Sequence, residues 1–301
     1  MAGANSTKAV ILALAANGAI AASKYVAAWV TSSGSMLAEA VHSTADCGNQ
    51  ALLLFGLKRA KRPPSDDYPM GYGKEIYFWS FIVAIMLFSV GGLFSLYEGW
   101  HKLHAPEPLA YPLVAIGVLA FGIAAEGFST WGCLREVNKL RGERSTWQWF
   151  RTSRNAELVV ILGEDLAALL GLTFAFVAVV LAWITGDPMW DALGGMAIGA
   201  LLIVVAAMVG VQVKQLLVGQ GVEAEVRGDM MEFLGAQPAV EKVLKLITLH
   251  MGDDVMVAVK ARMRDQGSQA ALVAAINATE AAFSERFPQA QWVFFEPDVV
   301  D

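Results

Sequence analysis

Two residues that could bind a metal ion or carry protons lie four positions apart in an apolar part of the chain. His42 and Asp46 belong to the stretch 35–57, which is otherwise apolar enough to cross a bilayer. Positions i and i+4 of a helix lie one above the other on the same face. An imidazole and a carboxylate at that spacing can share one cation. Because ionisable groups at membrane depth are costly, they usually line a polar path or a site.

Two adjacent carboxylates, Glu164 and Asp165, offer oxygen ligands from another apolar stretch. Adjacent residues of a helix point about 100° apart, so only one of the two can face a given site squarely. The alternative is a pair of charges that are favourable at a helix N-terminus, but residues 158–162 before them are already apolar. An imidazole with carboxylates suits Zn²⁺, and the same set would accept Mn²⁺, Fe²⁺, Co²⁺ or Cd²⁺.

The same side chains would couple a cation to protons. Histidine titrates near neutral pH and must be neutral to bind a metal ion. Cation binding would then release protons, and protonation would release the cation, which is the physical basis of a metal/proton exchanger. Cys47 lies one residue away from the face of His42 and Asp46, and we interpret it as a buried thiol rather than a ligand.

The composition indicates a membrane protein. Of the 301 residues, 56% are hydrophobic and 17% are charged, whereas soluble domains have roughly 45–50% and about 25%. No basic run of the nucleic-acid-binding type occurs, and the two cysteines make no disulfide framework. The first thirty residues are not typical of a signal peptide, because their long apolar stretch contains Asn17 and Lys24. Six segments suit a membrane-spanning helix: 9–30, 35–57, 76–100, 109–137, 158–183 and 189–218.

Positive charges are concentrated in two of the connections between these segments. Residues 58–74 and 135–154 are rich in Lys and Arg, whereas the turns 31–34 and 185–188 contain none. The positive-inside rule then places the cation-rich loops and both termini in the cytoplasm. We expect a multi-pass integral membrane protein, in the cell (inner) membrane if the protein is bacterial.

The tight turn at residues 31–34 predicts an antiparallel hairpin of the first two segments. Counting outward from the turn places Lys24 opposite Glu39 and Asn17 opposite Asp46. This predicts an ion pair between Lys24 and Glu39 near the outer surface, with a lysine that snorkels to the headgroups as the alternative. Asn17 is either a weak oxygen ligand or a helix-packing amide.

Small residues predict close helix packing in two other segments. Gly91, Gly92 and Ser95 lie in the third segment, and Gly195 and Gly199 in the sixth. Such spacings let helix backbones approach closely in a membrane. We interpret both sets as packing surfaces.

The chain changes character after residue 218. Residues 221–301 are charged, and they predict a helix at 223–235, strands at 240–251 and 254–264, a helix at 268–287 and a strand at 291–296. The predicted architecture is an all-α six-helix transmembrane bundle over residues 1–219, followed by a cytosolic α+β domain over residues 220–301 with a ferredoxin-like αββαβ order.

The motif around His42 resembles that of a known family. The run Ser35-Met36-Leu37-Ala38-Glu39-Ala40-Val41-His42-Ser43-x-x-Asp46, with Gly71-Tyr72-Gly73-Lys74-Glu75 after it, resembles the cation diffusion facilitator family. Residues 71–80 together with Glu164 and Asp165 are most similar to its zinc transporter 9-like branch. The resemblance implies a homodimer that exports divalent metal from the cytosol in exchange for protons, by alternating access. It also implies that His42, Asp46 and Asp165 form the transport site.

This chain departs from the family pattern at the fourth ligand. The histidine usual four residues before the helix-five aspartate is replaced by Ile161, which cannot bind a metal ion. The fourth position is then left to Glu164, Asn17, Asn49 or water, so metals other than zinc stay open.

Two further metal sites of the family are also altered. In the loop after the second segment, Tyr68 and Tyr72 stand where relatives have histidines, although Asp66 and Asp67 could bind a cation weakly. In the C-terminal domain the matching positions hold residues other than histidine, so we expect no binuclear zinc site there: Lys245, Lys260 and Phe294, with His250 and Glu296 nearby.

Two other functions compete with transport. An intramembrane metal-dependent hydrolase would use the same ligands, but the chain has no His-Glu-x-x-His run and no paired nucleophile and base. We therefore expect that the protein is not an enzyme. A membrane metal sensor or scaffold that does not transport is the second alternative, favoured by the missing fourth ligand.

Overall fold

The computed structural model describes residues 3–105 and 109–300, with side chains described from Asn17 onward. The chain divides into two compact units. The first holds residues up to Gly56, Trp79–Arg151 and Asn155–Val213. The second holds Leu57–Phe78, Thr152–Arg154 and Lys214–Asp301.

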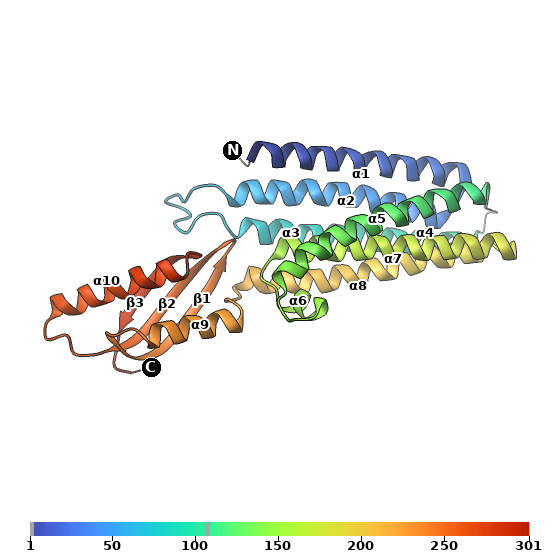
Figure 1. Ribbon diagram of the computed structural model, residues 1–301. Helices are drawn as coiled ribbons and strands as arrows, with labels where there is room; N and C mark the ends of the chain where they lie inside the picture. Colours follow the sequence, from blue (N-terminus) through green and yellow to red (C-terminus); the bar gives the residue numbers. More distant parts are fainter. Residues whose placement is uncertain (1–2, 106–108, 301) are drawn as a thin grey trace. The chain divides into compact units, whose positions relative to one another are not determined.

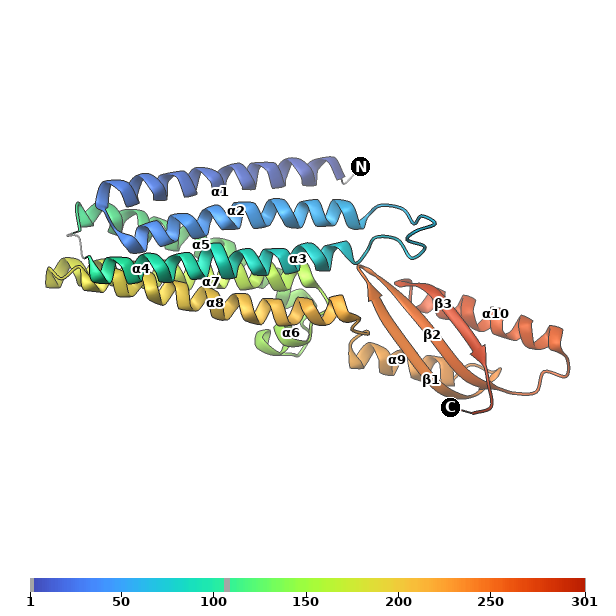
Figure 2. The same ribbon diagram turned by 180° about the vertical axis from the view of Figure 1, so that it is seen from behind.

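Long helices make up the first unit and lie side by side in both views (Figure 1, Figure 2). In chain order the helices that build it or lead into it are α1 (Gly3–Thr31), α2 (Gly34–Ala60), α3 (Glu75–Met86), a π-helical stretch η1 (Leu87–Leu93), α4 (Phe94–His104), α5 (Pro112–Leu140), the short α6 (Thr146–Thr152), α7 (Ala156–Thr185) and α8 (Met189–Val218).

Four stretches within the described residues are long and apolar enough to cross a membrane, judged by length and composition. They are Glu75–His104, Pro112–Leu140, Ala156–Thr185 and Met189–Val218. Each coincides with a predicted segment. The other two predicted segments also form helices, α1 and α2, of 29 and 27 residues. The mostly helical architecture of this part is thereby confirmed.

The predicted hairpin at the start of the chain is confirmed. Helix α1 ends at Thr31 and α2 begins at Gly34, so only two residues join them. Ser32 adopts φ +55°, a left-handed conformation that suits a tight reversal.

The glycines of the third and sixth segments pack against each other, as the small residues predict. A β-carbon added at Gly199 of α8 would lie 2.8 Å from the carbonyl oxygen of Gly92, and one at Gly99 would lie 2.6 Å from Met196. The segment is not one continuous α-helix, because Leu87–Leu93 is π-helical. This widened stretch contains Gly91 and Gly92, and its irregularity is a property of the packing that the sequence pattern did not predict.

The C-terminal part of the second unit has the predicted α-β-β-α-β order. Its elements are α9 (Ala224–Gly235), β1 (Val240–Met251), β2 (Asp254–Met263), α10 (Gln269–Arg286) and β3 (Ala290–Pro297). The sheet order is β1-β2-β3, with β2 antiparallel to β1 and parallel to β3. Alternate strand residues turn inward onto the two helices, and the core includes Leu246, Val257, Val259, Met230 and Phe283.

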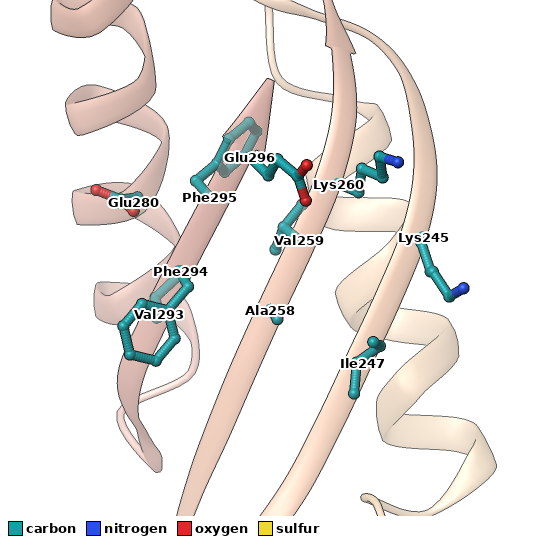
Figure 3. A pocket seen from close by; sticks show the side chains of 10 residues that line it. All are labelled: Lys245, Ile247, Ala258, Val259, Lys260, Glu280, Val293, Phe294, Phe295 and Glu296. Carbon is teal, nitrogen blue, oxygen red and sulfur yellow. The ribbon is translucent and has the colours of Figure 1, made fainter. Parts of the chain in front are cut away.

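The opposite face of this sheet carries a mixed apolar and charged surface (Figure 3). Ile247 of β1 pairs with Ala258 of β2, which in turn pairs with Phe294 of β3. Ile247 is 49% exposed and Phe294 is 59% exposed, so this apolar row is accessible to solvent in the single chain. Lys245, Lys260 and Glu296 form the neighbouring row in the same register.

The end of the α2–α3 connection and the first turn of α3 contact the tip of the β1–β2 hairpin within the second unit. The Tyr77 hydroxyl donates to the carbonyl oxygen of Gly252 at 3.0 Å and accepts from its N–H at 3.0 Å. Gly73 lies against the same turn, and a β-carbon there would come within 1.7 Å of the Met251 carbonyl oxygen. The second glycine of the Gly-Tyr-Gly motif, Gly73, therefore makes a backbone contact that leaves no room for a side chain.

Candidate functional site

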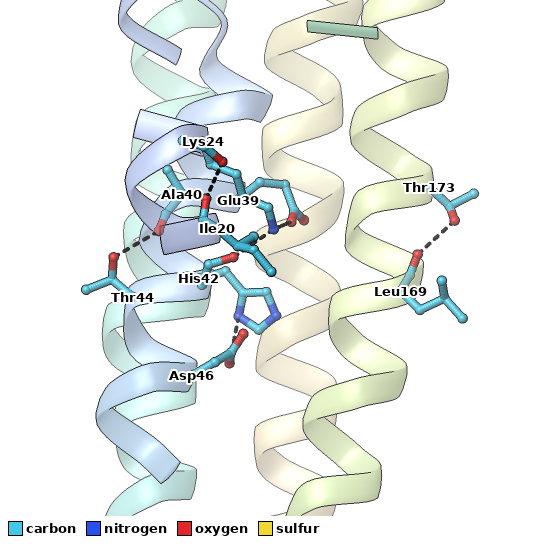
Figure 4. A network of polar contacts seen from close by, with 11 residues as sticks. Ile20, Lys24, Glu39, Ala40, His42, Thr44, Asp46, Leu169 and Thr173 are labelled. Carbon is cyan, nitrogen blue, oxygen red and sulfur yellow. Dashed lines mark hydrogen bonds and ion pairs between the residues drawn. The ribbon is translucent and has the colours of Figure 1, made fainter. Parts of the chain in front are cut away.

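His42 and Asp46 lie together on one face of α2, as their spacing predicts. His42 Nδ1 is 3.6 Å from Asp46 Oδ1, and the imidazole ring is directed at the carboxylate (Figure 4). The His42 side chain is fully buried and that of Asp46 is 20% exposed. Neither ring nitrogen has a hydrogen-bond partner among the described residues. A buried imidazole without such partners is unusual in a folded core, and both of its nitrogens can accept a further interaction partner.

Asp46 opens onto a cavity of about 110 Å³ inside the helical unit. Four helices contribute to its wall, namely α1, α2, α5 and α7. The polar side chains in the wall are carboxylates, amides and hydroxyls, with one lysine. They belong to Asn17, Lys24, Ser43, Asp46, Gln50, Glu126, Ser129, Glu164 and Asp165. An oxygen-rich cavity of this kind has the chemistry that cations prefer.

Glu164 and Asp165 of α7 both line this cavity, but their surroundings differ. Glu164 is buried and its Oε1 accepts a hydrogen bond from Asn49 Nδ2 at 2.6 Å. Among the described residues, no hydrogen bond to the Asp165 carboxylate is found. The adjacent carboxylates therefore divide into one that is held by an amide and one that is available to the cavity.

Asp46 and Asp165 share this cavity although they lie at different distances from the turns that begin α2 and end α7. Asp46 comes 12 residues after Gly34, where α2 begins, whereas Asp165 comes 20 residues before Thr185, where α7 ends. In Figures 1 and 2 the C-terminal end of α7 extends past the turn that joins α1 and α2. This protrusion agrees with the presence of both aspartates in one cavity wall.

The predicted metal ligands do not converge on a single point in the structure. Among the described residues, no three His, Cys, Asp or Glu side chains are placed to hold one metal ion as they stand. His42 contacts Asp46 but is not part of the cavity wall. The structure thus brings Asp46, Glu164 and Asp165 around one cavity, with His42 behind Asp46, in an open arrangement.

The predicted ion pair between Lys24 and Glu39 is present. Lys24 Nζ lies 3.2 Å from Glu39 Oε2 and donates to Ser43 Oγ at 2.7 Å (Figure 4). Both side chains are buried, so Lys24 does not snorkel outward. Gly171 of α7 makes the space for this pair, because a β-carbon there would lie 2.6 Å from Glu39 Oε1.

Asn17 takes part in the cavity wall through an amide contact. Its Nδ2 donates to Gln50 Oε1 at 3.1 Å, which joins α1 to α2. This is the packing role that the sequence left open beside ligation. Cys47 is a free, half-buried thiol and is not in the cavity wall.

Sequence reasoning missed Glu126 of α5. It contributes a fourth carboxylate to the cavity, from a helix in which no site residue was predicted. The signal was available, because Glu126 is a lone acidic residue deep inside an apolar span. Gln50, one turn after Asp46 on α2, was also missed.

The C-terminal positions for which the family resemblance implied metal ligands lie on the exposed sheet face. Lys245, Lys260, Phe294 and Glu296 all lie there (Figure 3). Lys260 is held by an ion pair with Asp298 at 2.7 Å. Two ammonium groups and a phenyl ring are not metal ligands, and the absence of a binuclear zinc site here stays a prediction.

The family comparison covers most of the chain. A family model described as "Cation efflux transmembrane domain" matches residues 10–218. This span includes every residue of the cavity wall.

Individual relatives agree with that match. The chain is 33% identical over 247 residues to the Xenopus laevis protein "Proton-coupled zinc antiporter SLC30A9, mitochondrial", which covers 81% of this chain and 44% of the relative. It is 30% identical over 241 residues to "Metal tolerance protein C4" of Arabidopsis thaliana, with 79% and 53% covered. It is 26% identical over 267 residues to "Cation-efflux pump FieF" of Yersinia pestis, with 89% and 84% covered. The chain thus spans about half the length of the first two relatives.

Proposed function

The chain belongs to the cation efflux family, near its branch of proton-coupled zinc antiporters, and from this we propose that it exports divalent cations in exchange for protons. Zinc is the cation we propose first, because the SLC30A9 relatives are named as zinc antiporters. The family consists of transporters, which agrees with the expectation that the protein is not an enzyme.

One observation carries the proposal: carboxylates from three different helices line a single cavity inside the helical unit. Asp46 comes from α2, Glu126 from α5, and Glu164 and Asp165 from α7. Uncompensated negative charge at membrane depth is costly. A cavity with this many carboxylates needs a bound cation or protons to offset that charge, and exchange of one for the other is the activity proposed here.

His42, Asp46, Asp165 and Glu164 are the ligands that we propose for the transported ion. Rotation of the His42 ring past Asp46 and a small approach of α7 to α2 would bring an imidazole nitrogen and carboxylate oxygens together, which suits tetrahedral Zn²⁺. The open arrangement of these groups supports a site that closes and reopens during transport by alternating access. Protons that reach His42 or the carboxylates would expel the ion, because each ligand must be deprotonated to bind it.

We further propose that six helices span the membrane, with both termini on the cytoplasmic side. Helices α1 and α2 would join the four apolar spans, their polar residues turned toward the cavity. Residues 1–219 would form the membrane domain and residues 220–301 a cytosolic domain of ferredoxin-like αββαβ type. The cell (inner) membrane is the proposed location for a bacterial protein.

A homodimer is the proposed assembly. The open apolar row of the sheet, Ile247, Ala258 and Phe294, is a surface that a second copy of the same domain could cover. Removal of exposed apolar area from water is the main driving force for such association. Cross-linking of the full-length protein in native membranes tests this, with Phe294→Asp expected to abolish the cross-linked dimer.

A membrane metal sensor or scaffold is the second candidate function, because Ile161 replaces the usual fourth ligand and the proposed ligands do not converge on one point. A protein that binds a cation without transporting it would also have an incomplete ligand set. The same departure from the family pattern leaves Mn²⁺, Fe²⁺ or Co²⁺ as alternative transported ions.

A flux assay tests the proposed function. The full-length protein in proteoliposomes, with a metal-sensitive dye inside, should move Zn²⁺ when a pH gradient is applied. Asp46→Ala and Asp165→Ala should abolish this flux, and Asp229→Ala, at an exposed position of α9, is the matched control. Zinc binding without flux in the wild type would favour the sensor, and undiminished flux in both cavity variants would refute the assigned site.

A further inference from the structure

Lys24 contributes the one cationic side chain in the described wall of the transport cavity. Its ammonium lies beside a wall that also carries the carboxylates of Asp46, Glu126, Glu164 and Asp165. It interacts electrostatically with Asp46 and with Glu126. A lysine that is 4% exposed in such surroundings acts as a positive charge built into the site.

The ammonium is not bound to any of those four carboxylates. It is held instead by two groups of α2, Glu39 Oε2 at 3.2 Å and Ser43 Oγ at 2.7 Å (Figure 4). Ser43 is in the cavity wall, whereas Glu39 is not. Lys24 is therefore anchored from one side by Glu39 while its charge faces the cavity.

Glu39 is placed so that it can hold this charge with only one of its oxygens. Its Oε2 binds Lys24, while its fully buried Oε1 has no hydrogen-bond partner among the described residues and lies against Gly171. A lysine side chain has a flexible four-carbon stem and three donors, so its ammonium can change acceptors without movement of the backbone. The strength of the Glu39 contact then determines how much of the Lys24 charge acts on the cavity.

We propose that Lys24 is a tethered counter-cation of the transport site, whose charge lowers the site's affinity for the divalent cation, and that Glu39 limits this effect by holding the ammonium. The inference rests on the proposed function, since it assigns a role at the same site. An empty cavity keeps part of its charge compensation from Lys24, and an arriving dication is repelled by it. The bound ion is consequently easier to release than it would be from four uncompensated carboxylates.

Two substitutions are expected to change affinity in opposite directions. Zn²⁺ binding to the full-length protein in lipid nanodiscs is measured by calorimetry. Lys24→Met should tighten binding by roughly tenfold, because it removes a like charge close to the ion. Glu39→Gln should weaken binding, because it frees the ammonium to approach the cavity carboxylates. Lys139→Met, at an exposed lysine that pairs with Glu136 on α5, is the matched control and should bind as the wild type does.

A double variant keeps the test decisive if a single variant fails to fold. Lys24→Met with Glu39→Gln removes the pair without leaving a buried charge behind, and it should also bind Zn²⁺ more tightly than the wild type. A purely structural ion pair would instead weaken binding in both single variants. Weaker or unchanged binding in Lys24→Met or in the double variant overturns the inference. Absence of Zn²⁺ binding by the wild type would overturn the proposed zinc transport itself, which separates the two failures.

Discussion

Asp191 of α8 accepts a hydrogen bond from the backbone N–H of Gly34, the first residue of α2, at 2.6 Å. The same buried carboxylate accepts from Ser33 Oγ at 2.7 Å and from the side chain of Ser35. The first N–H groups of a helix have no partner within the helix, and a negative charge there is favourable. The helix that carries His42 and Asp46 is thus capped by a residue more than 150 positions away in the sequence.

Removal of this cap should destabilise the membrane unit. We expect Asp191→Ala to lower the free energy of unfolding by about 2–4 kcal/mol, because buried donors lose a charged acceptor. Asp191→Asn keeps the shape and one acceptor oxygen, so its loss should be smaller. Thermal unfolding in detergent measures the order, with exposed Asp229→Ala as the control. Equal midpoints for Asp191→Ala and the wild type would contradict the capping role.

His42 and Glu164 should contribute unequally to cation binding. Both nitrogens of His42 lack partners among the described groups, whereas Glu164 is already committed to Asn49. We expect His42→Ala to weaken Zn²⁺ binding more than Glu164→Ala does, because one oxygen of Glu164 already accepts the Asn49 hydrogen bond. Calorimetry at one pH compares them. A greater loss in Glu164→Ala would reverse the assignment.

Glu126 should affect affinity without supporting the fold. It adds a carboxylate to the cavity wall from α5, where like charges from α2 and α7 face it. Glu126→Gln should weaken Zn²⁺ binding by roughly tenfold and leave the unfolding midpoint unchanged or higher, because it removes repulsion between like charges. Glu136→Gln, exposed on the same helix, is the matched control. Unchanged affinity in Glu126→Gln would remove this residue from the site.

His250 of β1 should make the second unit less stable in acid. Burial, and then the positive charge of Arg154, hold the pKa of His250 below its ordinary value of 6.5. The folded state therefore binds fewer protons than the unfolded state, and stability falls as the pH drops below about 6.5. His250→Gln should reduce the loss of unfolding temperature between about pH 7.5 and pH 5.5. The exposed His104→Gln should not, and an identical loss in His250→Gln would contradict the expectation.

Features set by local pattern were predictable from the sequence. The limits of β1 and β2 were predicted to within a residue, and β2 alternates buried and partly exposed residues over most of its length. The pair of Lys24 and Glu39 followed from counting outward from a two-residue turn, because an antiparallel hairpin leaves little freedom of register.

Features set by contacts between distant helices were not predictable in this way. The π-helical stretch Leu87–Leu93 lies where Gly92 meets α8, and nothing in its own residues demands a wider helix. Glu126 belongs to the cavity only because α5 packs beside α1 and α7, and a period of 3.6 residues does not say which neighbour a face meets. The cap on α2 depends on Asp191 in the same way.

The contact between Gly73 and the hairpin tip ties the α2–α3 connection to the C-terminal sheet. Backbone touches backbone there, and the tip at Gly252 and the residues that follow α2 belong to the same compact unit. Helix α2 runs into that unit at Leu57 without a break. The unit that holds the hairpin tip therefore also holds the last residues of α2, the helix that bears His42 and Asp46.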